Sequence, residues 1–155
     1  MKSIPLGSVL VAGGGRLSVL KSDAAYPGDL ADDSFDIVIL SLTLQAVHHP
    51  AFVLREMHRV ARRSIVSFPN FAHWRLRTQL AASGRMPVSP LLPYSWYETP
   101  NIRLCSITDF ESLAHAEDFT VERRILLDEA GRQQDGLTAR APNLLAAGAV
   151  YLLSR

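Results

Sequence analysis

The sequence has a single cysteine, Cys105, and it lacks several patterns that would assign a cellular compartment or a chemistry directly. One thiol excludes an internal disulfide framework and is typical of proteins in reducing compartments. No apolar run reaches the roughly 20 residues that cross a bilayer. The first residues combine one lysine with an early proline and glycine, a poor match to a secretory signal. From these absences we expect a cytoplasmic protein without a membrane partner.

Metal-binding and acyl-transfer motifs are missing as well. The five histidines occur without the short His or Cys spacings of a zinc site, and there is no Gly-x-Ser-x-Gly elbow. We therefore expect no metal and no serine nucleophile. Cys105 is best interpreted as a packing residue, because it lies beside Leu104 near an expected helix start.

The charge is nearly balanced, with 16 basic and 15 acidic residues, which argues against a nucleic-acid partner. Its distribution is uneven. Seven arginines and one acid lie between Arg55 and Arg85, whereas five acids and no lysine or arginine lie between Asp23 and Asp36. Such asymmetry is typical either of a solvated helix face or of a surface that steers an anionic ligand or an acidic partner.

A strand, a helix and a second strand are expected in the first half of the chain. Residues 35–41 form an apolar run typical of a strand that is buried on both faces of a parallel sheet. Pro50 to Arg62 has helical spacing of apolar side chains, and residues 64–68 predict the next strand. This order predicts a right-handed βαβ unit in a single α/β domain over residues 1–155.

Two more helices are expected after this unit. One covers Ala72 to Ala82 and ends at Ser83-Gly84, and the other opens with a capping box formed by Thr108 and Glu111. Residues 85–103, between them, are rich in proline and aromatic side chains. So long a stretch without regular structure is often functional.

Antiparallel strands are expected near both ends of the chain. The strand-like runs are residues 8–11, 17–20, 121–127 and 148–154. The run Gly13–Gly15 between the first two favours a hairpin over a strand-to-helix turn. The last two are separated by an expected polar loop over residues 132–142, which predicts an antiparallel pair at a sheet edge.

Several strings in the sequence resemble the MetW family of methionine-biosynthesis proteins. They are residues 35–46, 68–74, 84–88, 92–97, 99–102 and 149–155. In this order they extend the resemblance over the chain from about Arg16 to Arg155. The resemblance implies a Rossmann-like sheet of the class I methyltransferase type, with residues 36–41 as its fourth strand, 64–68 as its fifth and a C-terminal antiparallel strand pair.

The first part of the chain departs from the pattern of that fold. Such folds open with a strand, an acidic-x-Gly-x-Gly loop and a helix whose N-terminus holds S-adenosylmethionine. Here the nearest match is Val11 to Gly15, with Val11 at the acidic position. Too few residues separate Gly15 from Phe35 for the usual helix, strand and helix. We therefore expect a sheet truncated at the N-terminus, with residues 1–15 divergent or replaced.

The resemblance also implies two groups of site residues. Cofactor contacts would come from Asp23, Ala24, Ser41 and Leu42, although an isolated aspartate at a strand end is usually a turn residue. A partner or substrate loop would include Asn70, His73, Trp74, Arg85, Tyr94, Trp96, Tyr97 and Asn101. Its aromatic part is typical either of a lid that packs on the sheet edge or of a docking surface. Arg75, Arg77 and Arg85 would suit a carboxylate or phosphate, although such arginines are more often solvated.

The function implied by the resemblance is that of a partner or activating subunit of a homoserine O-acyltransferase. Two alternatives remain: an S-adenosylmethionine-dependent methyltransferase, and a non-functional fragment of either protein. No residue is assigned a catalytic role.

Overall fold

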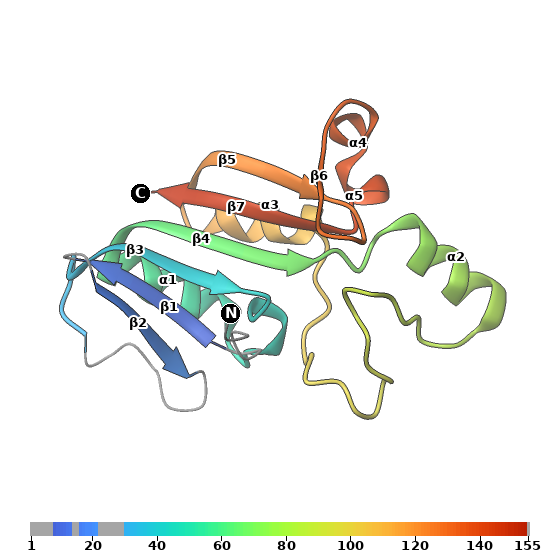
Figure 1. Cartoon of the computed structure of the whole chain (residues 1–155), viewed down its shortest axis with the longest axis horizontal. Helices are drawn as coiled ribbons and strands as arrows, with labels where there is room; N and C mark the ends of the chain where they lie inside the picture. The colour runs from blue at the N-terminus through green and yellow to red at the C-terminus, as the bar shows by residue number, and fades with distance from the viewer. Residues whose placement is uncertain (1–7, 14–15, 22–29, 155) are drawn as a thin grey trace.

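The structure is a computed structural model, and it describes residues 8–13, 16–21 and 30–154, with side chains from Leu30 onward. Its centre is a seven-stranded sheet in the order β2-β1-β3-β4-β7-β5-β6 (Figure 1). The strands are β1 (Ser8–Gly13), β2 (Arg16–Lys21), β3 (Phe35–Ser41), β4 (Ala61–Pro69), β5 (Thr120–Leu127), β6 (Gln133–Gln134) and β7 (Gly148–Ser154). The helices are the 3-10 helix η2 (Leu44–Ala46) and the α-helices α1 (Pro50–Val60), α2 (Trp74–Ser83), α3 (Ile107–Ala116), α4 (Leu137–Arg140) and α5 (Pro142–Leu145).

The predicted βαβ unit is confirmed. Strands β3 and β4 pair in parallel, and helix α1 connects them. The predicted end of the helix at Arg62 is wrong, because Ala61 already has an extended backbone (φ −147°, ψ 149°) and pairs with Phe35 at the start of the ladder. The helix therefore ends, and strand pairing begins, two residues before the end of the helical pattern in the sequence.

The core lies on one face of the sheet. Alternate strand residues such as Leu40, Val66 and Tyr151 are fully buried in one cluster with residues of α1 and α3. Figure 1 shows both helices on this same side of the sheet. The intervening residues, among them Ile39 and Ile65, are only half-buried. The prediction that residues 35–41 are buried on both faces is therefore wrong for one face.

The C-terminal antiparallel pair is confirmed, since β5 and β7 pair over seven residue positions from Thr120↔Ser154 to Leu127↔Gly148. Strand β7 also pairs with β4, so it is an inner strand of the sheet. The edge strand on this side of the sheet is β6. The segment 132–142, predicted as a polar loop, contains β6, α4 and the first residue of α5. Elements of two to four residues are too short to leave a periodic pattern in the sequence.

Helix α2 begins at Trp74 instead of Ala72, and it ends as predicted at Gly84, whose left-handed backbone (φ 65°) suits glycine. The capping box of α3 is formed by Ser106 and Asp109, so the predicted box at Thr108 and Glu111 is wrong. The same motif occurs twice with an offset of two residues, and only the first copy lies where the backbone turns into the helix.

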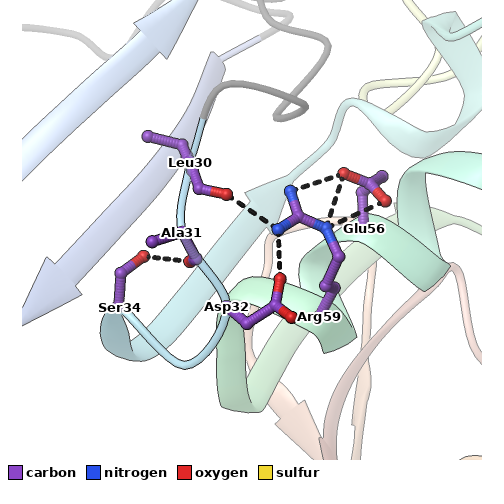
Figure 2. A network of polar contacts seen from close by, with 6 residues as sticks. All are labelled: Leu30, Ala31, Asp32, Ser34, Glu56 and Arg59. Atoms are coloured by element: carbon purple, nitrogen blue, oxygen red, sulfur yellow. Dashed lines mark hydrogen bonds and ion pairs between the residues drawn. The ribbon is translucent and has the colours of Figure 1, made fainter.

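Arg59 attaches the segment before β3 to helix α1 (Figure 2). Its guanidinium donates to Glu56 at 2.9 Å, to the carbonyl oxygen of Leu30 at 2.7 Å and to the carboxylate of Asp32. These hydrogen bonds, first the one to Glu56 and then the one to Asp32, raise the pKa of Arg59 above its usual value. An acid of the acidic stretch therefore pairs with an arginine of the basic stretch.

Three further arginines of the basic stretch, Arg55, Arg63 and Arg75, form ion pairs with Glu117, Glu122 and Glu129. Because four of its seven arginines are neutralised in this way, the stretch serves mainly to connect elements on the surface. This finding favours the structural interpretation over the steering of an anionic ligand by the whole stretch. Within the ranges that the structure describes, no helix is long and apolar enough to cross a membrane.

Candidate functional site

Gly13 and Arg16, where β1 ends and β2 begins, lie at the edge of the sheet opposite to the one expected of a cofactor loop. Strands β1 and β2 form the predicted hairpin, with Gly13 paired to Arg16. Strand β1 is also antiparallel to β3, with Val9 opposite Leu40 and Ala12 opposite Ile37. The last residue of β1, Gly13, therefore lies beside the amino end of β3, and the arrows of β1 and β3 point in opposite directions in Figure 1.

This arrangement does not fit the binding of S-adenosylmethionine through the glycine segment. Ligands of α/β sheets bind outside the carboxyl ends of parallel strands, where a glycine turn leads into a helix N-terminus. Here β1 and β2 are two paired strands, and the end of β1 at Gly13 lies at the other edge. Two of the predicted cofactor contacts, Asp23 and Ala24, lie outside the described residues.

The other two predicted cofactor contacts, Ser41 and Leu42, lie at the carboxyl end of β3 and are half-buried. Leu42 has a left-handed backbone (φ 48°), a conformation that costs a non-glycine residue about 1–3 kcal/mol. Hydrogen bonds hold it there: its N–H donates to the carbonyl oxygen of Ser67 at 3.0 Å, and its carbonyl oxygen accepts from Nε2 of Gln45 at 2.8 Å. The turn after β3 is thus held in one conformation.

Asn101 is brought to this same turn. The backbone N–H groups of Ile102 and Arg103, which follow it, both donate to the carbonyl oxygen of Gln45 at 2.9 Å. The buried side-chain oxygens Oε1 of Gln45 and Oδ1 of Asn101 accept no hydrogen bond from the described part of the chain. Sequence reasoning missed Gln45, because a single glutamine in a short 3-10 helix belongs to no motif.

Asn70 and His73 lie in the interior, just after β4. Asn70 is fully buried, its Nδ2 donates to the carbonyl oxygens of Asn143 at 3.0 Å and Ala146 at 2.7 Å, and its Oδ1 accepts from Ala72 N at 3.0 Å. His73 is 6% exposed, and its burial lowers its pKa below the usual value, so the ring is neutral at pH 7. Both residues connect the end of β4 with the segment around α5.

The remaining residues of the predicted loop lie on the surface. Trp96 and Tyr97 are 72% and 69% exposed, and their rings meet edge to face at 5.6 Å between centroids. Together with Arg85, Met86 and Val88 they line a hollow of about 610 Å³. We call these five residues the aromatic surface. Sequence reasoning selected Arg85, Trp96 and Tyr97 but missed the two aliphatic members.

Trp74 and Tyr94 are exposed as well, at 42% and 40%, but they do not line this hollow. The Arg75 guanidinium lies over the Trp74 ring, 5.4 Å from its centroid. The predicted loop is therefore divided by the structure into a buried junction, an exposed aromatic surface and Asn101 at the turn after β3.

Comparison with known proteins gives a family and a fold. The sequence profile of the family described as "Methionine biosynthesis protein MetW" matches residues 11–153. The bifunctional methionine biosynthesis protein MetXA/MetW of Rhodopirellula baltica is 38% identical over 126 residues, which are 80% of this chain and 20% of that protein. The chain thus spans about a fifth of the length of the curated relative it matches.

Solved structures with a similar fold include a SAM dependent methyltransferase from Archaeoglobus fulgidus, with a TM-score of 0.55 and 13% identity over 92% of this chain and 69% of that one. An S-adenosylmethionine dependent methyltransferase from Mesorhizobium loti has a TM-score of 0.51 and 16% identity, covering 81% and 64% of the two chains. At these identities the likeness shows the fold alone. The predicted Rossmann-like sheet of the class I methyltransferase type is confirmed.

Proposed function

The chain belongs to the MetW family of methionine biosynthesis proteins, and from this premise we propose that it acts as a partner subunit of a homoserine O-acyltransferase. The observation that carries the proposal is the exposed aromatic surface. We expect this complex to act in the cytoplasm, because the single cysteine is typical of a reducing compartment.

The aromatic surface has the composition of a binding site for another protein. Tryptophan, tyrosine, arginine and methionine are enriched at protein–protein interfaces. Trp96 and Tyr97 leave most of their large rings in water, and burial of this apolar surface against a partner would be favourable. Arg85, which also lines the hollow, adds a planar hydrogen-bond donor.

The relative from Rhodopirellula baltica supports the choice of partner. Its name joins MetXA with MetW, and the MetW-like region covers only 20% of its length. We take MetXA to be the acyltransferase part. Two modules in one polypeptide meet at high effective concentration, whereas separate chains need a binding surface with enough affinity of its own. In a separate chain, the aromatic surface would supply that affinity.

The test is a direct binding measurement with the purified homoserine O-acyltransferase of the same source. We expect a complex at micromolar concentration in sedimentation velocity and in biolayer interferometry. Trp96→Ala should weaken the dissociation constant about 30-fold, which corresponds to about 2 kcal/mol for a hot-spot tryptophan. Leu137→Ala is the matched control, since Leu137 is an equally exposed apolar residue (71%) outside the aromatic surface. No complex, or equal effects of the two variants, would contradict the proposal.

The second candidate function, methyl transfer, is supported by the fold, and the direction of β1, which is antiparallel to β3, argues against it. We therefore propose that the chain fulfils its role without S-adenosylmethionine. Isothermal titration with this cofactor should give a dissociation constant weaker than about 1 mM, which corresponds to only about 4 kcal/mol of binding free energy. Micromolar binding would instead favour the methyltransferase.

A further inference from the structure

A second cavity, of about 490 Å³, lies beyond the carboxyl end of β4, between helix α2 and the start of helix α3. Leu76, Leu80 and Leu104 contribute apolar side chains to its lining. The volume is in the range of small-molecule sites, which are mostly apolar with a few polar groups. Its position is also the edge at which α/β sheets bind ligands.

Two opposite charges line this cavity, Arg77 from α2 and Asp109 from the first turn of α3. The Nε of Arg77 donates to the carbonyl oxygen of Ala72, which fixes the base of the guanidinium and leaves its terminal amino groups for a ligand. Oδ2 of Asp109 accepts from the backbone N–H of Ser106 at 3.1 Å and from its hydroxyl at 2.6 Å. The carboxylate is thus fixed, while its Oδ1 accepts nothing from the described residues.

Neither charge has a counter-ion of its own. Within the part of the chain that the structure describes, Arg77 and Asp109 form no ion pair, whereas the neighbouring Arg75 is paired with Glu129. A simple anion would be repelled by Asp109, and a simple cation would be repelled by Arg77. A ligand that carries both signs could pair with both charges at once, whereas a ligand with one sign could pair with only one of them.

We propose that this cavity binds a free α-amino acid with an apolar side chain. Arg77 would receive the α-carboxylate, because its planar guanidinium donates two parallel hydrogen bonds to a carboxylate. Asp109 accepts the α-ammonium group. The leucines Leu76, Leu80 and Leu104 receive the side chain. This site is separate from the aromatic surface, so its existence does not depend on the proposed partner.

The only cysteine of the chain provides a reporter, because Cys105 lines the same cavity. Burial, and then the charge of Asp109, raise the pKa of the Cys105 thiol to about 12, so its alkylation is slow. The reaction is measured over hours by mass spectrometry of the intact protein. With L-methionine as the probe, we expect the alkylation rate by iodoacetamide to fall at least fivefold at saturation. N-acetyl-L-methionine, L-methionine methyl ester and glycine, each lacking one of the three features, should change the rate less than twofold.

Substitutions at the two charged residues test whether each of them binds the amino acid. Arg77→Gln and Asp109→Asn should each raise the concentration of L-methionine needed for half-protection at least tenfold. Asparagine keeps an oxygen for the helix cap, so Asp109→Asn decides the matter if Arg77→Gln fails to fold. Arg62→Gln and Asp118→Asn remove charges that are likewise exposed but lie outside the cavity, and they should leave protection unchanged. The proposal is overturned by no protection at 20 mM, by equal protection from N-acetyl-L-methionine, or by equal losses in the control variants.

Discussion

Two neighbouring residues of β3 provide a test of the one-sided core. Leu40 is fully buried under helices α1 and α3, whereas Ile39 points to the opposite face and is half-buried. Truncation of either side chain to alanine removes three carbon atoms, each worth about 0.8 kcal/mol when buried. Because the two positions share one strand, differences in strand pairing between the variants are small.

The expected free energies follow from the burial. At Leu40 the full transfer free energy of about 2.4 kcal/mol is lost, and the cavity left in the packed core raises the cost of Leu40→Ala to about 3–4 kcal/mol. At Ile39 solvent fills the space and only about half of the transfer free energy is lost, so Ile39→Ala should cost about 1 kcal/mol. For a chain of this size the two melting temperatures should fall by roughly 6–16 °C and 2–4 °C.

Urea unfolding followed by circular dichroism measures the loss of unfolding free energy in both variants. The comparison requires that the variants share the same slope of free energy against urea concentration. A cost for Ile39→Ala equal to that for Leu40→Ala would refute the one-sided core, because it would mean that the second face is covered in solution. The wild-type transition is informative by itself. A broad transition without cooperativity would favour the non-functional fragment, whereas we expect a single sharp one.

Three further predictions concern buried or paired polar groups. Burial lowers the pKa of His73, so the unfolded chain binds a proton more readily than the folded one, and the free energy of unfolding should fall as the pH drops from 7 towards 5.5. In urea unfolding, His73→Gln should reduce this dependence of stability on pH, whereas the substitution His115→Gln at an exposed histidine should not. Arg59→Lys keeps the charge but loses the planar contacts to Glu56, so the melting temperature should fall, and an unchanged value would contradict the role of this network. Tyr151→Phe removes the hydroxyl that donates to a glutamate at 2.7 Å and should cost about 1 kcal/mol in urea unfolding; a value near zero would make that hydrogen bond irrelevant to stability.

The sequence predicted the elements that have long, regular patterns. The run 35–41 and the helical spacing after Pro50 gave the βαβ unit, and the triple glycine gave the hairpin of β1 and β2. The burial of only one face was not predictable, because an apolar run looks the same whether one or two layers cover it. The capping box of α3 was predicted two residues too late, because two overlapping segments fit the capping-box pattern. Only the backbone conformation shows that Ser106 begins the helix.

The candidate site was predicted in part. Trp96, Tyr97 and Arg85 were selected by residue type, and the structure adds that they line one hollow. Asn70 was selected together with them but is fully buried, and residue type alone does not reveal exposure. The charged cavity was missed because Arg77 and Asp109 are 32 positions apart in the sequence and line one cavity only in the folded chain.

The direction of β1 limits what the glycine turn can do. Strand β3 has seven residues, which at about 3.3 Å each separate its two ends by roughly 20 Å. Gly13, beside the amino end of β3, is therefore too far from Leu42 to hold a nucleotide over the carboxyl end, whatever residues follow it. Restoring an acid at Val11 would not change this distance, because the strand itself runs the other way. Among the residues that the structure describes, binding at the carboxyl edge would then depend on the segments after β3 and β4, which carry the strained turn at Leu42, the aromatic surface and part of the charged cavity.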